Sequence, residues 1–196
     1  MIAGYILTGG KNRRMNGNKK LFLTYKGMPF YKHIISAFQN LPIIYLSVDA
    51  TDAYQKLHMP MIVDLYPDIG PIGGIYSGLI QCKETSLFVT ACDMPLIGQN
   101  IVEQVCEEYQ KHPQKITIVK SGERLQPLFG IYPKTVLPLL EQMITEKRYR
   151  MMDLFAQADI GVIQLENASQ AMRNINTVDE YQILQGESNG TKTESF

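Results

Sequence analysis

The chain has 196 residues, of which 45% are hydrophobic and 19% charged, and its formal net charge is zero. This length suits a single domain with a sizeable core. The balanced charge argues against a protein that binds nucleic acid over its surface, because such proteins usually carry an overall basic excess. We expect one domain over residues 1–186 and a polar tail over residues 187–196 that is disordered.

The three cysteines do not form a pattern typical of a disulfide framework or a metal site. Cys82, Cys92 and Cys106 are odd in number and lack CxxC spacing. The apolar run at the N-terminus is too short to span a membrane and lacks the basic segment and cleavage site of a secretory signal. We therefore expect a soluble, cytoplasmic protein that binds neither membranes nor nucleic acid.

The first part of the chain is predicted to alternate strands with helices. Short apolar, β-prone runs indicate strands, and Pro29 suits the first position of a helix. In chain order we expect a strand at 1–6, a loop at 8–20, a strand at 21–25, a helix at 29–39, a strand at 43–48, a short helix at 52–57, a strand at 61–63, a Pro/Gly-rich loop at 66–74 and a helix that ends at Cys82.

The second part continues this alternation from its most hydrophobic strand, at residues 86–91. Thr177 and Glu180 form a capping box, which predicts that the last helix begins at Thr177. Alternating strands and helices predict an α/β protein with a mostly parallel sheet and helices on both faces. The remaining elements are expected to be a helix at 99–110, strands at 116–120 and 125–132, helices at 134–145 and 150–157, and a strand at 160–165.

Glycines and charged residues follow several of these strands directly. In parallel sheets, ligands bind beyond the carboxyl ends of the strands. That rule selects the loop at 8–20, Asp64, the loop at 66–74 and Asp93, each of which follows a predicted strand. We expect the ligand site at this edge of the sheet.

The loop at 8–20, here called the basic loop, is typical of a phosphate-binding segment. It contains the Gly9–Gly10 pair, and five of the ten residues 11–20 are Lys or Arg. Glycines allow close backbone approach, and backbone N–H groups with cations bind phosphates. The alternative is a solvated surface loop. Neither the Walker A pattern nor the dinucleotide pattern G-x-G-x-x-G is present, so the loop predicts a triphosphate site of another kind.

Two aspartates are candidates for the chemistry at this edge. Asp93 is a natural Mg²⁺ ligand, because Mg²⁺ is bound through one or two carboxylates together with substrate phosphates. The alternative for Asp93 is a turn or cap before Pro95, and the alternative for Asp64 is simple termination of its strand. Lys19 is the candidate phosphate-binding lysine of the basic loop.

Four motifs, in order along the chain, resemble those of the molybdenum cofactor guanylyltransferases. Residues 7–10 with 14–19 resemble the signature L-A-G-G-x-x-x-R-M-G-x-D-K. Residues 70–75 resemble G-P-L-A-G-I, residues 92–95 match C-D-M-P, and residues 174–177 match N-x-N-T. They are spread in order over nearly the whole chain, so together they are much more specific than any single motif.

The resemblance implies a Rossmann-like nucleotidyltransferase fold and a reaction. GMP would be transferred from GTP to molybdopterin, with Mg²⁺, forming the guanine dinucleotide cofactor and releasing pyrophosphate. It also implies transient protein partners that deliver or receive the cofactor. The implied nucleotide-binding residues are Leu7, Thr8, Gly9, Gly10, Lys19, Asp64 and Asp93. The implied catalytic residues are Arg14, Lys19 and Asp93, with Asp93 as the metal ligand.

Three departures from the signature bear on activity. Thr8 replaces a small Ala where close packing on the base is expected, Asn16 replaces Gly and Asn18 replaces Asp. Two other functions stay open at this point: a related nucleotidyltransferase that uses CTP or a sugar phosphate, and a non-catalytic nucleotide-binding relative. Gly9 has no Cβ and leaves room beside the base, which favours a purine.

Overall fold

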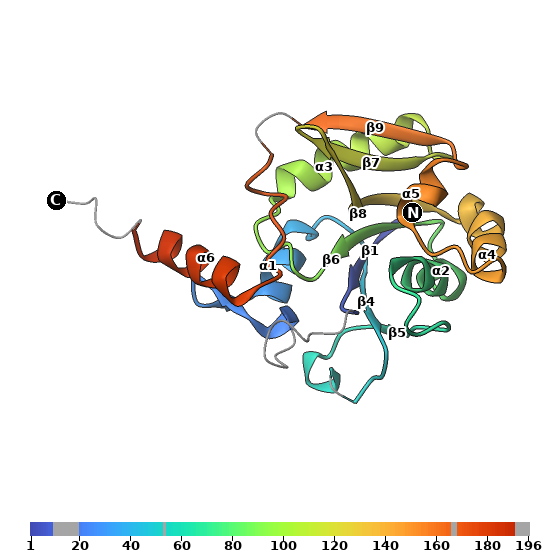
Figure 1. Cartoon of the computed structure of the whole chain (residues 1–196). Coiled ribbons are helices and arrows are strands. Elements are labelled where there is room, and N and C mark those ends of the chain that lie inside the picture. Colours follow the sequence, from blue (N-terminus) through green and yellow to red (C-terminus); the bar gives the residue numbers. More distant parts are fainter. Residues whose placement is uncertain (10–19, 53, 166–167, 191–196) are drawn as a thin grey trace.

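A seven-stranded sheet forms the centre of the computed structural model (Figure 1). The structure describes residues 1–9, 20–52, 54–165 and 168–190, and residues 188–190 are described by their backbone alone. Its strands are β1 (Ile2–Leu7), β4 (Ile44–Val48), β5 (Met61–Val63), β6 (Ser86–Ala91), β7 (Ile116–Ser121), β8 (Arg124–Pro133) and β9 (Ile160–Leu165). They lie in the order β5-β4-β1-β6-β8-β7-β9. The described pairings are parallel except those of β8 with β6 and β7, so the predicted mostly parallel sheet is confirmed.

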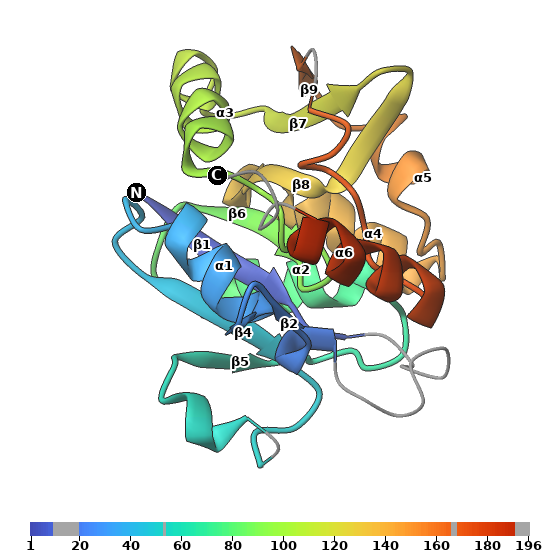
Figure 2. The ribbon, with the colours of Figure 1, turned by 90° about the vertical axis from the view of Figure 1, so that its left-hand side faces the viewer.

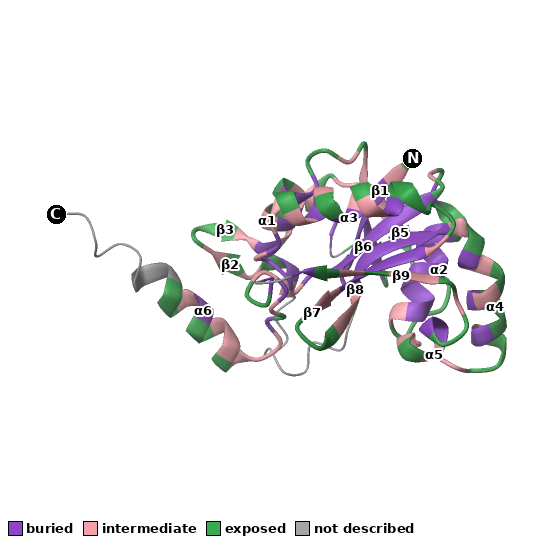
Figure 3. Ribbon diagram, turned by 90° about the horizontal axis from the view of Figure 1, so that it is seen from above, coloured by how far each residue is buried: buried purple, intermediate pink, exposed green. Residues whose placement is uncertain are grey.

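Helices cover both faces of the sheet, as predicted. On one face lie α1 (Phe30–Ala37) and α3 (Gln99–Lys111), and on the other lie α2 (Pro71–Gln81), α4 (Leu137–Thr145) and α5 (Met151–Phe155). Each face has its own apolar core, and the central strands between the cores are buried (Figure 3). None of the described helices has the length and apolar character that crossing a membrane requires. Single 3-10 turns are η2 (Lys20–Phe22), η3 (Gln55–Leu57) and η4 (Lys134–Val136).

β1 shows why the central strands are apolar on both sides. Tyr5 and Leu7 pack into the core formed with α2, whereas Ile6 packs into the core formed with α1 and α3. Gly4 leaves room for Phe38, because a Cβ at Gly4 would lie 2.7 Å from Phe38 Cδ2. A strand that is buried on both faces needs this near-continuous apolar sequence.

β8 runs antiparallel to β7 because the turn that joins the two strands is too short for a crossover. Ser121 pairs directly with Arg124, and Gly122 between them has a φ of 57°. Two parallel strands would need a connection of a dozen or more residues.

The prediction of a strand at 21–25 is wrong in part. Its first residues belong to the 3-10 turn η2, and only β2 (Thr24–Tyr25) is extended, paired with β3 (Met28–Pro29) in a separate hairpin. Both turn residues between β2 and β3 have positive φ, the conformation that closes a two-residue hairpin. The helix predicted at 52–57 is likewise reduced to η3.

The last helix, α6 (Val178–Gly190), begins at the predicted capping box. Thr177 Oγ1 accepts a hydrogen bond from the backbone N–H of Glu180 (3.2 Å), and Glu180 Oε2 accepts one from the backbone N–H of Thr177 (2.9 Å). The helix continues to Gly190, so residues 187–190 of the predicted disordered tail are helical. The polar composition predicted a disordered tail, but the helix cap and the buried Leu184 stabilise the first turns of α6. α6 projects from the body of the molecule in Figure 1, and in Figure 2 it lies in front of the body, toward the viewer.

The packing of α2 against the sheet can be tested at Gly78. A Cβ at this position would lie 2.6 Å from Tyr5 Cζ and 2.7 Å from Leu87 Cδ1, both in the packed core. We expect Gly78→Ala to lower the free energy of unfolding by about 1–3 kcal/mol in urea unfolding, because the core must shift to accept the methyl group.

Gly186→Ala, in α6, is the matched control. No described atom lies within 4 Å of the added Cβ. Because Ala also loses less backbone entropy than Gly in a helix, this variant should gain about 0.5–1 kcal/mol. Two variants of equal stability would contradict the close approach of α2 to β1 and β6.

Candidate active site

A pocket of about 170 Å³ lies at the carboxyl ends of β1, β4, β5 and β6, beside the amino end of α2. This is the edge that the sequence selects for a ligand. The described residues that line it are Leu7, Gly9, Lys20, Ser47, Asp64, Gly70, Pro71, Gly74, Ala91, Cys92, Asp93 and Leu128.

The predicted site residues divide into three groups. Leu7, Gly9, Asp64 and Asp93 line the pocket together. Thr8 follows Leu7 but is not among the lining residues. The third group, Gly10, Arg14, Lys19 and the departures Asn16 and Asn18, lies outside the described residues.

Asp93 lies beyond the carboxyl end of β6 and is held from two sides. Its Oδ2 atom accepts a hydrogen bond from Lys20 Nζ at 3.0 Å, and its backbone carbonyl accepts one from the N–H of Ile175 at 2.9 Å. Its Oδ1 atom is buried and has no hydrogen-bond partner among the described residues. A buried carboxylate oxygen without a partner is a feature that needs an explanation, such as an ion.

The donor set at Asp93 fits Mg²⁺ bound together with phosphates. Among the described residues, no group of three or more His, Cys, Asp or Glu could hold a metal ion by itself. Mg²⁺ is commonly bound by one or two carboxylates, water and substrate phosphates rather than by a complete protein cage. Asp93 Oδ1 would be one such ligand.

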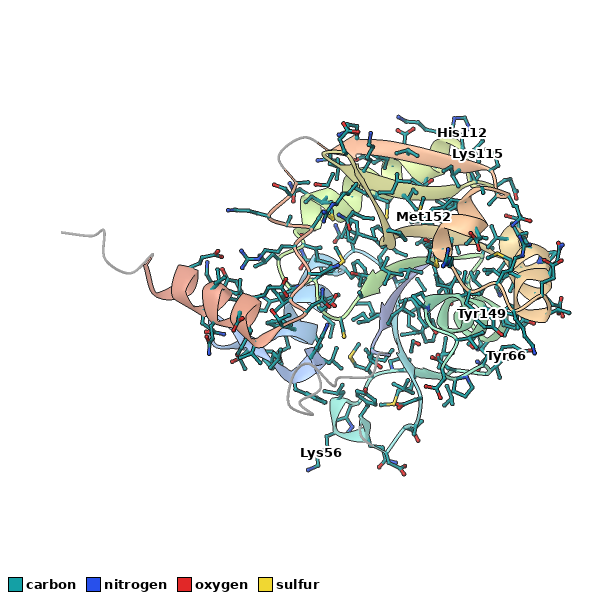
Figure 4. The ribbon with its side chains drawn as sticks, viewed as in Figure 1. Lys56, Tyr66, His112, Lys115, Tyr149 and Met152 are labelled. Atoms are coloured by element: carbon teal, nitrogen blue, oxygen red, sulfur yellow. The ribbon has the colours of Figure 1, made fainter. Side chains whose placement is uncertain are left out.

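Lys20 is a site residue that the sequence analysis did not select. Its ammonium bonds Asp93 and also donates to Asn176 Oδ1 at 2.6 Å, and its side chain is only 16% exposed. Of the described residues that line the pocket, it alone is a cation, whereas Lys56 on η3 points away from the molecule (Figure 4). The sequence signal was the Lys19–Lys20 pair, but a loop sequence has no periodicity that would have singled out Lys20.

Ser47 and Asp64 form the second polar side of the pocket. Asp64 directly follows β5, and its Oδ1 atom accepts a hydrogen bond from Ser47 Oγ at 2.7 Å. Ser47 is 1% exposed and was not predicted as a site residue, because nothing in its own segment marks it. Burial raises the pKa of Asp64, the hydrogen bond from Ser47 opposes this, and the charge of Asp49 adds to it.

Thr8 is accommodated without entering the pocket. Its side chain is 7% exposed, and its hydroxyl donates a hydrogen bond to the backbone carbonyl of Ser47. The β-branched side chain of Thr8 was expected to limit packing against the base. Because this side chain is not among the residues that line the pocket, only the backbone of Thr8 is available to contact the base. The Ala-to-Thr departure adds a bond between β1 and β4 at the mouth of the site.

The loop at 66–74 places the amino end of α2 against the pocket. Gly70 caps this helix with a φ of 74°, and Pro71 occupies its first turn. A Cβ at Gly74 would lie 2.9 Å from Leu7 Cδ2 and 3.3 Å from Ser47 Oγ, so only glycine permits this approach. Helix amino ends carry partial positive charge and favour anions.

Cys92 is an unsuitable nucleophile although it lines the pocket. Burial, together with the neighbouring charge of Asp93, raises the pKa of its thiol to about 12. The thiol therefore stays protonated near neutral pH, and only a thiolate is strongly nucleophilic.

Comparison with known families decides which class of site this is. Residues 4–160 match the family described as the MobA-like NTP transferase domain, and this match includes all the described residues that line the pocket. The chain belongs to the MobA-like NTP transferase family. The resemblance found in the sequence motifs is thereby confirmed.

Relatives of this MobA-like NTP transferase have similar lengths. A probable molybdenum cofactor guanylyltransferase from Flavobacterium johnsoniae is 33% identical over 91% of this chain and 94% of its own. The molybdenum cofactor guanylyltransferase from Vibrio cholerae is 28% identical over 89% of this chain and 87% of its own.

The fold is shared with a solved structure. The molybdopterin-guanine dinucleotide biosynthesis protein A from Archaeoglobus fulgidus superposes with a TM-score of 0.81 over 96% of this chain and 99% of that chain, at 21% identity. The predicted Rossmann-like nucleotidyltransferase fold is therefore confirmed.

The raised pKa of Asp64 predicts a pH-dependent effect in this MobA-like NTP transferase. Because the folded protein binds this proton more tightly than the unfolded chain, stability falls as pH rises through the raised pKa. Asp64→Asn removes the charge and keeps an oxygen that can accept the bond from Ser47.

The free energy of unfolding of Asp64→Asn, relative to the wild type, should therefore increase as pH rises from about 4, the ordinary pKa of an aspartate, through the raised pKa of Asp64. Urea unfolding at a series of pH values measures this difference. A difference that stays constant or decreases with pH would show that burial does not disfavour the charged carboxylate.

Proposed function

We propose that this MobA-like NTP transferase acts as a single nucleotidyltransferase domain that transfers GMP from GTP to molybdopterin. The product is the guanine dinucleotide cofactor, and pyrophosphate is released. The observation that carries the proposal is the pocket lined by Lys20, Asp93 and Asp64, in a chain that is 33% identical to a probable molybdenum cofactor guanylyltransferase. The proposal includes a cytoplasmic location and transient partners that deliver or receive the cofactor.

The charges of the pocket set the orientation of the nucleotide. Asp93 and Lys20 lie beyond β6, and Asp64 lies beyond β5, with β1 and β4 between them. The triphosphate lies toward Lys20, because its ammonium is the cation of the described lining. We keep Gly10, Arg14 and Lys19 of the basic loop as further proposed phosphate contacts.

The base then lies toward Asp64. Guanine carries N–H donors on its base-pairing edge, including the exocyclic N2 amine, and a carboxylate only accepts hydrogen bonds. Gly9 leaves space at this end, since no described atom lies within 4 Å of a Cβ built there. Leu7 and the backbone of Thr8 complete the proposed base contacts.

An adjoining hollow extends the pocket at its Asp64 end. It has a volume of about 670 Å³ and shares Gly9, Asp64 and Gly70 with the first pocket. Its lining includes Asp49, Asp64 and Asp68, so the hollow extends the proposed site at the end of the base rather than at the end of the phosphates.

Transfer needs no covalent intermediate on the protein. An oxygen of the molybdopterin phosphate attacks the α-phosphorus of GTP, the new P–O bond forms, and the bond from the α-phosphorus to the bridging oxygen breaks. The electron pair leaves with pyrophosphate. Lys20 holds the phosphates in line for this attack and balances charge on the leaving group, with Lys19 and Arg14 as proposed helpers. Asp93 would hold Mg²⁺, which when bound neutralises phosphate charge.

The experiment that tests this function measures pyrophosphate release with Mg²⁺ and molybdopterin, comparing GTP with CTP. We expect release with GTP, with a higher kcat/KM than with CTP, because the pocket offers acceptors to guanine and space for a purine. A clear preference for CTP would contradict the proposed transfer of GMP. Tight GTP binding without pyrophosphate release would indicate a non-catalytic relative.

Asp93→Asn tests the role of the carboxylate. The substitution keeps the shape of the side chain and removes the charge, so we expect kcat to fall by about 100-fold or more while the protein stays folded. Single-turnover pyrophosphate release measures the effect, with circular dichroism as the folding control. Turnover like that of the wild type would refute Asp93 as the metal ligand.

A further inference from the structure

The segment before α6, which contains the N-x-N-T motif at residues 174–177, reaches into the site although it lies outside the stretch that matches the MobA-like NTP transferase domain. That match ends at residue 160. Asn176 Oδ1 nevertheless accepts a hydrogen bond from Lys20 Nζ at 2.6 Å, and the buried Ile175 donates its N–H to the Asp93 carbonyl at 2.9 Å. The C-terminal segment thus contacts both members of the Lys20–Asp93 pair.

Glu180 holds this segment in place. Its Oε2 atom accepts hydrogen bonds from the backbone N–H groups of Asn176 (2.7 Å) and Thr177 (2.9 Å). Burial of Glu180 acts to raise its pKa, but these hydrogen bonds and the nearby charge of Lys20 lower its pKa overall. One carboxylate oxygen therefore fixes the residue whose side chain bonds the Lys20 ammonium.

The rest of α6 is anchored to the chain just after Lys20. Tyr181 donates its hydroxyl hydrogen to the Thr24 carbonyl at 2.9 Å, and Gln185 donates to the same carbonyl. Leu184 packs with Phe30 in a small apolar cluster. Figure 3 shows α6 on the same side of the molecule as the β2–β3 hairpin. Asn176, just before α6, thus bonds the Lys20 side chain, and α6 itself bonds the chain that follows Lys20.

We infer that Glu180 is a positioning residue that, through Asn176, holds the Lys20 ammonium at the place where it receives the triphosphate. This inference rests on the proposed function for the identity of the nucleotide. The contacts among Glu180, Asn176 and Lys20 do not depend on that function. It makes α6 part of the nucleotide-binding machinery rather than an appendage of the domain.

The charge and the hydrogen bonds of Glu180 have opposite effects on nucleotide binding, and this separates the inference from simple electrostatics. A negative charge near Lys20 repels a triphosphate, so removing that charge alone should strengthen binding. Removing the oxygen that holds Asn176 should weaken binding, because Lys20 loses its fixed position. Glu180→Gln removes the charge and keeps an acceptor oxygen, whereas Glu180→Ala removes both.

The first measurement is the affinity for GTP by isothermal titration calorimetry. We expect Glu180→Ala to bind GTP about three- to tenfold more weakly than the wild type, the range that a lost hydrogen bond gives. Glu180→Gln should bind as tightly as the wild type or more tightly. Ile183→Ala, at a 58% exposed position of the same helix, is the control and should leave affinity unchanged. Urea unfolding checks that all three variants are folded.

The second measurement needs no nucleotide. An amine-reactive acetylating reagent modifies lysines at rates that depend on how firmly their ammonium groups are held, and mass spectrometry reads the modification of Lys20. We expect faster acetylation of Lys20 in Glu180→Ala than in the wild type or in Glu180→Gln.

The outcomes distinguish the inference from the proposed function. If Glu180→Ala leaves acetylation of Lys20 unchanged, or if both Glu180 variants change GTP affinity alike, the positioning role is overturned. If wild-type protein fails to bind GTP, or if Lys20→Ala binds it normally, the proposed nucleotide site is wrong, while faster acetylation in Glu180→Ala still supports the positioning of Lys20.

Discussion

The ion pair between Lys20 and Asp93 is the interaction on which the rest of the site depends. Both side chains are largely buried, at 16% and 14% exposed, and an unpaired charge in such a place would be costly. The pair joins the segment after the basic loop to the end of β6, and through Asn176 to the start of α6. Three parts of the chain that are far apart in sequence therefore meet at one ammonium group.

The sheet makes this meeting possible by ending its strands at one level. Leu7 of β1 pairs with Ser47 of β4 on one side and with Ala91 of β6 on the other. The residues just beyond, Thr8 and Cys92, are consequently neighbours, and the close approach at Gly74 brings the amino end of α2 to the same edge. Buried, apolar strands give the site a rigid base, which suits a reaction that depends on positioning.

The polar groups around this edge lie at two ends, a carboxylate at one and an ion pair at the other. Asp64, oriented by Ser47, lies beyond β5, and the Lys20–Asp93 pair lies beyond β6. A guanine nucleotide has hydrogen-bond donors at its base and negative charge at its phosphates, so it complements this division in one orientation. The departure at Thr8 strengthens the arrangement, because its hydroxyl fixes the backbone of Ser47. Family membership and pocket chemistry thus support the same proposal from independent directions.

The sequence by itself determined the features that depend on neighbouring residues. The alternation of apolar runs predicted the sheet, the Thr177–Glu180 spacing predicted the start of α6, and Asp64 and Asp93 stood out because each follows a strand. The sequence did not predict the antiparallel direction of β8 or the β2–β3 hairpin, both of which depend on the short turns that close them. Only the tertiary structure selected Lys20, Ser47 and the inward turn of the Thr8 hydroxyl. The reason is that these roles rest on contacts across the sheet, and the bond from Lys20 to Asn176 joins residues 156 positions apart, where no local pattern reaches.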